Sequence, residues 1–321
     1  GMLRIVPLGD LTMFVICGEA LFDVFAAGDT PTGLMLDARV GGSPFNVAVG
    51  LARLGQPVGF FGGVSSGFLG ERLMRALQEE GVDTHCTPRS PARTTLSLVG
   101  VDAAGVPSYS FYGEGAADRG VTQAALAAIP PEARAFHVGS YATVVEPVAG
   151  TQRALIEREH KRSLISFDPN IRLNVEPDLA RWHALLDWML PRTHLLKVSD
   201  EDLGLLFPGQ APATLAAQWL ARGVAMVVVT RGGEGALAWT AAAQAEAAPV
   251  RVDVVDTVGA GDTFQAALLT WLAEYDALSP MALRTLPAEQ IKAALDFAAR
   301  AAAITCSRRG ADLPRRAELP A

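Results

Sequence analysis

The sequence predicts an α/β fold in which a mostly parallel central sheet is covered by helices on both faces. Two observations carry this prediction. Short runs rich in Val, Ile, Leu and Phe alternate along the chain with longer segments of helical periodicity. The short runs are mostly apolar, as strands buried on both faces are. With 50% hydrophobic and 19% charged residues, the 321-residue chain can build one large core, and we expect a single domain over residues 13–321.

The elements follow one another in a regular order. Several helical segments end at a glycine, as helix C-termini commonly do, for example NVAVGLARLG, GERLMRALQEEG and TLAAQWLARG. The expected strands are MFVIC (13–17), VGFFGGV (58–64), AFHVGS (135–140), SLISFD (163–168), THLLKVS (193–199) and AMVVVT (225–230).

Three regions depart from this rhythm. Residues of about 20–40 and 94–117 alternate as strand–turn–strand units do, and predict a small sheet that projects over one end of the main one. The last residues, DLPRRAELPA, are polar and contain proline, which predicts a loose tail. Gly1 before Met2 is typical of a tag remnant, so residues 1–12 are expected to be an N-terminal extension, with Met2 or Met13 as the natural start.

Composition excludes several classes of function. A formal net charge of −7 provides no basic surface for nucleic acid, and no apolar run reaches the ~20 residues that a membrane helix needs. Cys17, Cys86 and Cys306 lie far apart without CxxC spacing, and the five histidines show no metal-ligand spacing. We expect reduced thiols in a cytoplasmic protein with no nucleic-acid or membrane partner.

One short stretch, DTVGAGDTF (256–264), indicates chemistry. Small residues at a helix start leave backbone N–H groups open to an anion, and Asp262 follows in the first turn, where the helix dipole favours its ionised form. Such a pair suits phosphoryl transfer, because the carboxylate accepts a hydroxyl proton while the N–H groups stabilise the transferred charge. The residues alone leave a second interpretation open, in which Asp262 is a helix N-cap. In the helix itself, Phe264, Leu268, Leu272 and Tyr275 predict one buried stripe.

The same stretch carries a family resemblance. DTVGAGDTF resembles the C-terminal signature of PfkB-family, ribokinase-like carbohydrate kinases, and GGSPFNVAVGLARLGQPVGFFGGVSSGFLG (41–70) resembles the N-terminal one. GEALFDVF (18–25) and RRGADLP (308–314) extend the resemblance over nearly the whole chain. It implies a ribokinase-like fold with the small sheet as a lid, Asp262 as catalytic base, and the backbone of Gly259, Ala260 and Gly261 as part of the anion hole.

The sugar site has two interpretations for each candidate. Asn46 can pair with a hydroxyl or cap a helix, and Asp23 can accept hydroxyl hydrogen bonds or be a turn acid. The resemblance implies that Asp23, Gly41, Gly42 and Asn46 line a sugar pocket. Arg172, in FDPNIR at a strand end, is expected to meet a phosphate oxygen of the substrates or to form a surface ion pair.

The nucleotide site rests on two further segments, KVSDED and VTRGGEGA (229–236), of which the second resembles the family's Thr-x-Gly-x-x-Gly nucleotide loop through Thr230, Gly232 and Gly235. KVSDED (197–202) reads as a helix capped by Ser199, and the family's usual Asn-x-x-Glu is replaced here by Ser199 and Asp202. The resemblance implies ATP with Mg²⁺ as cofactor, held through water by Asp202, and a K⁺ site beside Asp256. The expected ATP-binding residues are Lys197, Ser199, Thr230, Gly232, Gly235 and Gly261.

GEALFDVF, HVGS and LLKVSDEDL resemble fructokinase versions of their segments, which implies transfer from ATP to a primary hydroxyl of fructose. The alternatives are a 2-keto-3-deoxygluconate kinase, a ribokinase-type kinase and a non-catalytic sugar or nucleotide sensor. Many relatives carry an arginine after the lid tyrosine, but Gly113 follows Tyr112 here, which argues against an acidic substrate unless Arg93 or Arg119 compensates. Apolar residues of the lid, Leu34, Leu36 and Val40, serve either a homodimer or a sugar cover.

Overall fold

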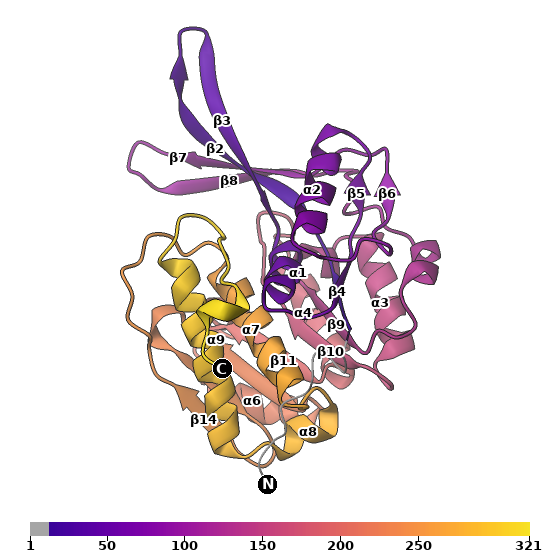
Figure 1. Cartoon of the computed structure of the whole chain (residues 1–321), viewed down its shortest axis with the longest axis vertical. Coiled ribbons are helices and arrows are strands. Elements are labelled where there is room, and N and C mark those ends of the chain that lie inside the picture. The colour runs from indigo at the N-terminus through magenta and orange to yellow at the C-terminus, as the bar shows by residue number, and fades with distance from the viewer. Residues whose placement is uncertain (1–12) are drawn as a thin grey trace.

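The computed structural model describes residues 13–321; the expected extension at 1–12 lies outside this range. An eight-stranded sheet with the order β14-β13-β12-β11-β10-β9-β1-β4 forms its centre (Figure 1). The six strands from β12 to β4 are parallel and coincide with the six predicted runs. Their bounds are β1 Phe14–Cys17, β4 Val58–Phe61, β9 Ala135–Gly139, β10 Leu164–Asp168, β11 Leu195–Ser199 and β12 Met226–Thr230.

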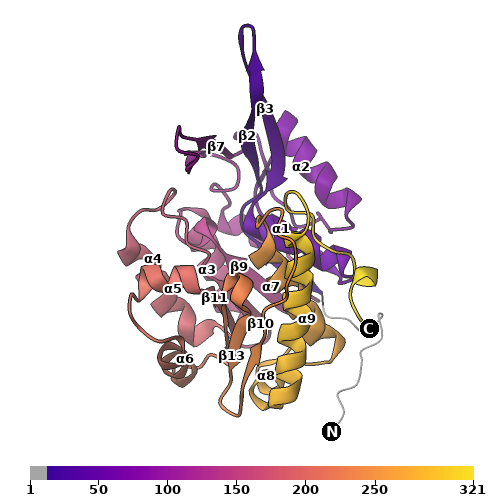
Figure 2. The same ribbon diagram turned by 90° about the vertical axis from the view of Figure 1, so that its left-hand side faces the viewer.

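Helices cover both faces of this sheet (Figure 2), as expected. In β1, Phe14 and Ile16 join one hydrophobic core while Val15 and Cys17 join the other, so the strand is buried on both sides. The first core includes residues of α1 Ser43–Arg53, α2 Phe68–Glu79, α7 Ala260–Glu274, α8 Pro280–Thr285 and α9 Ala288–Cys306. The second includes residues of α3 Val148–Glu159, α4 Leu179–Met189, α5 Asp200–Leu206 and α6 Pro212–Ala221. Within residues 13–321, every helix is too short or too polar to cross a membrane.

Two strands at one edge were not predicted. β13 (Ala236–Trp239) and β14 (Gln244–Ala247) form an antiparallel hairpin that extends the sheet beyond β12. Their sequences, ALAW and QAEA, are rich in alanine, which is depleted in strands. Pairing with β12 and packing, not local propensity, make these residues strands.

More of the surface of α7 is buried than the single stripe that the sequence predicts. Every residue from Thr263 to Ala273 is buried, because α7 packs between α1 and α9. Two of its polar side chains donate hydrogen bonds inside the protein: Thr270 Oγ1 to the Ala266 carbonyl over 2.8 Å, and Gln265 Nε2 to Ser166 Oγ over 2.8 Å. The helix that starts at the glycine loop is therefore central to the molecule.

The predicted small sheet is present, with the order β3-β2-β7-β8. The β2–β3 hairpin stands away from the main body in both views (Figures 1 and 2). At its outer end, Leu34, Met35 and Leu36 are more than half exposed. The bounds are β2 Leu21–Thr30, β3 Gly33–Gly41, β7 Leu96–Val101 and β8 Pro107–Tyr112, and a two-stranded sheet is formed by β5 Val64–Ser65 and β6 Arg89–Ser90.

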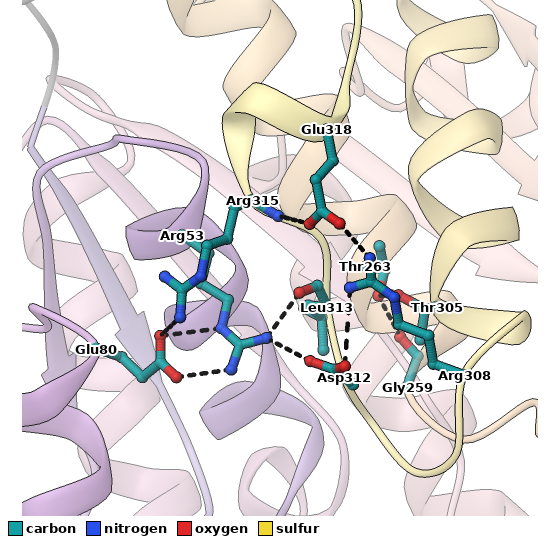
Figure 3. A network of polar contacts seen from close by, with 10 residues as sticks. All are labelled: Arg53, Glu80, Gly259, Thr263, Thr305, Arg308, Asp312, Leu313, Arg315 and Glu318. Carbon is teal, nitrogen blue, oxygen red and sulfur yellow. Dashed lines mark hydrogen bonds and ion pairs between the residues drawn. The ribbon is translucent and has the colours of Figure 1, made fainter.

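The prediction of a loose C-terminal tail is wrong. Leu313 and Leu319 are buried, with 2% and 7% exposure. Arg53 of α1 reaches across to this segment and donates to the Leu313 carbonyl over 2.7 Å and to Asp312 over 2.9 Å (Figure 3). Arg316 pairs with Glu274 at 2.7 Å. Two buried leucines and these ion pairs dock a segment whose composition alone indicated disorder.

Candidate active site

A cleft of about 630 Å³ lies where the carboxyl ends of the parallel strands meet the small sheet, the edge at which open α/β sheets bind ligands. Asp168, Ser199 and Thr230, the last residues of β10, β11 and β12, line it. The predicted site residues in its lining are Asp23, Gly42, Asn46, Arg172, Lys197, Ser199, Asp202, Thr230, Gly259, Ala260, Gly261 and Asp262. Gly41, Gly232, Gly235 and Asp256 lie outside this lining.

The Asp262 carboxylate is held by two side chains of α1. Ser43 Oγ donates to Oδ1 over 2.6 Å, and Asn46 Nδ2 donates to Oδ2 over 3.0 Å. Burial raises the pKa of Asp262, while these two hydrogen bonds and the Lys197 ammonium oppose the rise. Sequence reasoning missed Ser43, although it lies in the GGSPFN segment that contains Asn46.

The loop before α7 presents backbone donors to the cleft. Gly259 is the N-cap, with a left-handed φ of 79°, and a Cβ there would lie 2.8 Å from the Ala311 Cβ. The Ala260 N–H donates to the Thr257 carbonyl over 3.2 Å. Within residues 13–321, the N–H groups of Gly261 and Asp262 have no backbone or side-chain acceptor outside the helix, which leaves two donors for an anion. The interpretation of Asp262 as the N-cap is excluded.

A buried ion pair lies beside this loop. Lys197 Nζ is 2.8 Å from Asp168 Oδ2, and the two side chains are 3% and 9% exposed. A Cβ on Gly261 would lie 3.6 Å from the same Nζ. The ammonium group therefore adjoins both the loop and the floor of the cleft. Sequence reasoning assigned no role to Asp168, although it lies in the FDPNIR segment. Lys197 lies in a predicted buried strand, and a buried lysine needs a carboxylate partner, so the sequence did carry a signal for Asp168.

The opposite end of the cleft is acidic. Burial raises the pKa of Asp23, on β2, above its usual value. The hydrogen bond from Ser97 and the charge of Arg172 oppose part of this rise. Gly41 packs directly against the Asp23 carboxylate, because a Cβ at Gly41 would lie 2.5 Å from Asp23 Oδ2. Gly42 has a φ of 103°, and a Cβ would lie 2.6 Å from the Glu19 carbonyl. The paired glycines thus bring the chain close to Asp23 and Glu19.

Around Ser199, the predicted helix cap is confirmed: Ser199 Oγ accepts from the Asp202 N–H over 3.2 Å. Asp202 Oδ2 accepts from the Ile171 N–H over 3.1 Å. Burial and the charge of Asp168 raise the pKa of Asp202 to about 6. A carboxyl group in such a negative setting is suited to meeting a cation.

The remaining predicted residues shape loops. Gly232 and Gly235 have φ values of 54° and 92°, which the tight turn between β12 and β13 requires. The Asp256 carboxylate accepts from the N–H groups of Val258 (3.1 Å) and Gly310 (3.0 Å), tying the glycine loop to the C-terminal segment. Among residues 13–321, no cluster of three or more His, Cys, Asp or Glu side chains is suited to a metal ion.

The two arginines suggested as substitutes for a lid arginine do not line the cleft. Arg119 lies over the ring of Tyr141, 5.3 Å from its centroid, and Gly113 is packed against it. Of the residues between 13 and 321 that line the cleft, Arg172 is the one arginine.

The chain is similar to known proteins over nearly its whole length. Residues 3–317 match the model of the pfkB family of carbohydrate kinases. A fructokinase from Rhizobium leguminosarum bv. trifolii is 35% identical over 304 residues, 95% of this chain and 91% of the relative. A fructokinase from Xylella fastidiosa with bound ATP is 30% identical, with a TM-score of 0.83 over 95% of this chain and 96% of the other.

A double mutant of the Vibrio cholerae O395 fructokinase, in a form with bound fructose, ADP and potassium ion, is 26% identical. Its TM-score is 0.79, and the match covers 94% of each chain. The expected ribokinase-like fold is thus confirmed. Since the family model spans almost the entire sequence and the relatives match over nearly their full length, this chain belongs to the pfkB family of carbohydrate kinases.

Proposed function

We propose that this protein transfers the γ-phosphoryl group of ATP to a primary hydroxyl of fructose. The observation that carries the proposal is the Asp262 carboxylate, held by Ser43 and Asn46 in the same helical turn as the unpaired N–H groups of Gly261 and Asp262. A base and an anion hole fixed on one rigid helix start are what phosphoryl transfer to an alcohol needs. The fructokinase relatives support fructose as the acceptor.

Asp262 accepts the proton of the attacking hydroxyl. Its raised pKa makes it a stronger base than an ordinary aspartate, while the bonds from Ser43 and Asn46 keep it ionised and aligned. The N–H groups of Gly261 and Asp262, with the Lys197 ammonium nearby, offset the charge that develops on the transferred group.

The sugar lies at the acidic end of the cleft, where Asp23 and Asn46 pair with its hydroxyls. The missing Cβ atoms of Gly41 and Gly42 leave room for the Asp23 carboxylate and the Glu19 carbonyl beside this part of the chain. The small sheet acts as a lid that limits water near the phosphate, and Arg172 meets a phosphate oxygen at the boundary of the two substrates.

The nucleotide takes the side of the cleft formed by Lys197, Ser199 and Thr230, with Gly232 and Gly235 shaping the adjoining turn. Mg²⁺ usually binds proteins through one or two carboxylates plus substrate phosphates, and the buried Asp202 fits that mode through water. When bound, the ion would neutralise phosphate charge.

A potassium site beside Asp256 is also part of the proposal, since that carboxylate has lone pairs beyond the two that accept from Val258 and Gly310. The exposed tip residues Leu34, Met35 and Leu36 are proposed to contact a second copy of the chain. Sedimentation of the wild type and of Leu34→Ser/Leu36→Ser tests this contact; equal mass for both would contradict it.

The decisive experiment measures ADP release from Mg·ATP with fructose, ribose, 2-keto-3-deoxygluconate and no sugar, with Asp262→Asn as control. Fructose-dependent turnover that this variant abolishes is expected. Turnover on the keto acid alone would replace fructose by an acidic substrate and assign Arg172 to its carboxylate. Equal rates without sugar, or equal rates in the variant, would overturn the kinase mechanism.

A further inference from the structure

One buried acid in the cleft has no role in the reaction described so far. Glu19 lies just after β1 and lines the cleft, although the residue is only 1% exposed. Its Oε2 atom has no hydrogen-bond partner among residues 13–321. A buried polar atom without a partner is costly, so such atoms in a binding cleft indicate a ligand contact.

A neighbouring acid shows what a structural carboxyl group looks like here. Asp118 is 2% exposed, and both its oxygens are used: Oδ1 accepts from Thr95 Oγ1 over 2.7 Å, and Oδ2 accepts from the Tyr141 hydroxyl. Asp118 does not line the cleft, whereas Glu19 does. These two buried acids therefore differ: Asp118 has a partner for each oxygen, whereas Oε2 of Glu19, a residue that lines the cleft, has none among residues 13–321.

We propose that Glu19 is a sugar-binding residue, whose carboxyl group pairs with a hydroxyl of the substrate and selects sugars that carry a hydroxyl at that position. The inference rests on the proposed function, because it takes a sugar as the occupant of the acidic end. Glu19 and Gly42 line the same cleft, and the Glu19 backbone carbonyl lies against Gly42, so a sugar bound at this glycine lies on the Glu19 side of the cleft. Such a contact discriminates strongly, because a sugar lacking the hydroxyl leaves the buried carboxyl unpaired.

The surroundings of Glu19 allow its carboxyl group either to donate a hydrogen bond to a sugar hydroxyl or to accept one from it. Burial raises the pKa of Glu19 to about 7, and the negative Asp118 adds to the rise, while Ser140 and Arg172 oppose it. Tyr141, also buried, faces the same group. Near neutral pH the carboxyl group therefore exists in both forms, and a sugar hydroxyl, which donates and accepts, pairs with either.

The test compares the wild type with Glu19→Gln, Glu19→Leu and a control, Glu79→Gln, at an exposed acid of α2. Turnover and ATP-free calorimetric binding are measured with the preferred sugar and with its monodeoxy analogues. For the preferred sugar, Glu19→Leu is expected to raise KM and the dissociation constant at least tenfold with a smaller change in kcat. Glu19→Gln is expected to lie in between, and Glu79→Gln to match the wild type.

One deoxy analogue is expected to bind the wild type at least tenfold more weakly than the parent sugar, and this difference should vanish in Glu19→Leu. A purely structural role would not produce that coupling. Unchanged binding in folded variants, or an equal loss for all analogues in every protein, would overturn the inference while leaving the kinase function intact. If Glu19→Leu does not fold, Glu19→Gln decides. A wild type that neither binds nor phosphorylates any sugar would overturn the proposed function, and this inference with it.

Discussion

Nδ2 of Asn46 lies 3.0 Å from Oδ2 of Asp262, and 216 positions of sequence separate the two residues. This hydrogen bond joins the start of α1 to the start of α7, so the carboxylate is oriented by a helix that is itself fixed against the central sheet. Asn46 was predicted as a sugar ligand or a helix cap; in the structure its amide also positions Asp262.

Replacing Asp262 by Asn removes the base but keeps the size of the side chain. We expect kcat to fall by roughly 10²–10⁴, the usual contribution of a positioned general base, with little change in sugar KM. Steady-state ADP release measures both. A variant with more than a tenth of wild-type kcat would show that Asp262 is not the base.

Ser43→Ala removes a donor to the ionised form of Asp262. Because that hydrogen bond lowers the pKa of Asp262, its loss raises the pKa, and the fraction of ionised base falls at acidic pH. We expect the acidic limb of the kcat/KM profile to move to higher pH by roughly one unit, since a hydrogen bond to a charged group contributes about 1.5–3 kcal/mol. Ser43→Thr keeps the hydroxyl and should retain the wild-type profile; an unmoved limb in Ser43→Ala contradicts the assignment.

Lys197→Met leaves Asp168 as a buried charge without its partner. Breaking such a pair costs about 3–5 kcal/mol of unfolding free energy. The double variant Lys197→Met/Asp168→Asn should recover most of this stability, yet not the activity, because the cation beside Gly261 stays absent. Denaturant unfolding and ADP release separate the two effects. Recovery of activity in the double variant would assign Lys197 a structural role only.

Glu19→Gln is expected to change how stability depends on pH. The pKa of Glu19 is raised from 4.5 to about 7 in the folded protein, so the folded state holds a proton that the unfolded state releases between these values. The wild type therefore loses stability as pH rises from 4.5 to 7, by roughly 3 kcal/mol at most. Gln is neutral throughout, so the variant should gain on the wild type over this window. Parallel stability curves from pH 4 to pH 8 would refute the shifted pKa.

Arg53→Ala removes the hydrogen bonds and ion pair that join α1 to the C-terminal segment. The Arg53 side chain is 16% exposed and bonds to Glu80, Asp312 and the Leu313 carbonyl. We expect a loss of about 1–3 kcal/mol, because Glu80, 18% exposed, is left without its main partner. Arg315→Ala is the control: its side chain is 61% exposed and contacts Glu80 at 3.5 Å, so it should cost under about 1 kcal/mol. If thermal unfolding shows the same loss of stability for Arg53→Ala and Arg315→Ala, the contacts of Arg53 with the C-terminal segment are not important for stability.

Much of this architecture can be read from local patterns. The mostly apolar runs predict the six parallel strands because a strand buried on both faces has few polar positions. The GAGD residues predict an open helix start because small side chains are needed there. The alanine-rich β13 and β14 carry no such local signal. Ser43 and Glu19 gain their places only when distant segments meet, so neither their partners nor the lack of one is visible in the sequence.

The C-terminal segment has a consequence for biosynthesis. Gly310 binds the Asp256 carboxylate, Ala311 lies against Gly259, and Leu313 is held by Arg53. The glycine loop is therefore braced by residues that the ribosome adds only after the loop itself. A nascent chain can form the early strands and even α7 while it is still attached to the ribosome. It gains its phosphoryl-binding geometry only after residue 313 has emerged from the exit tunnel. Incomplete translation products that stop before this point would fold in part and yet consume no ATP.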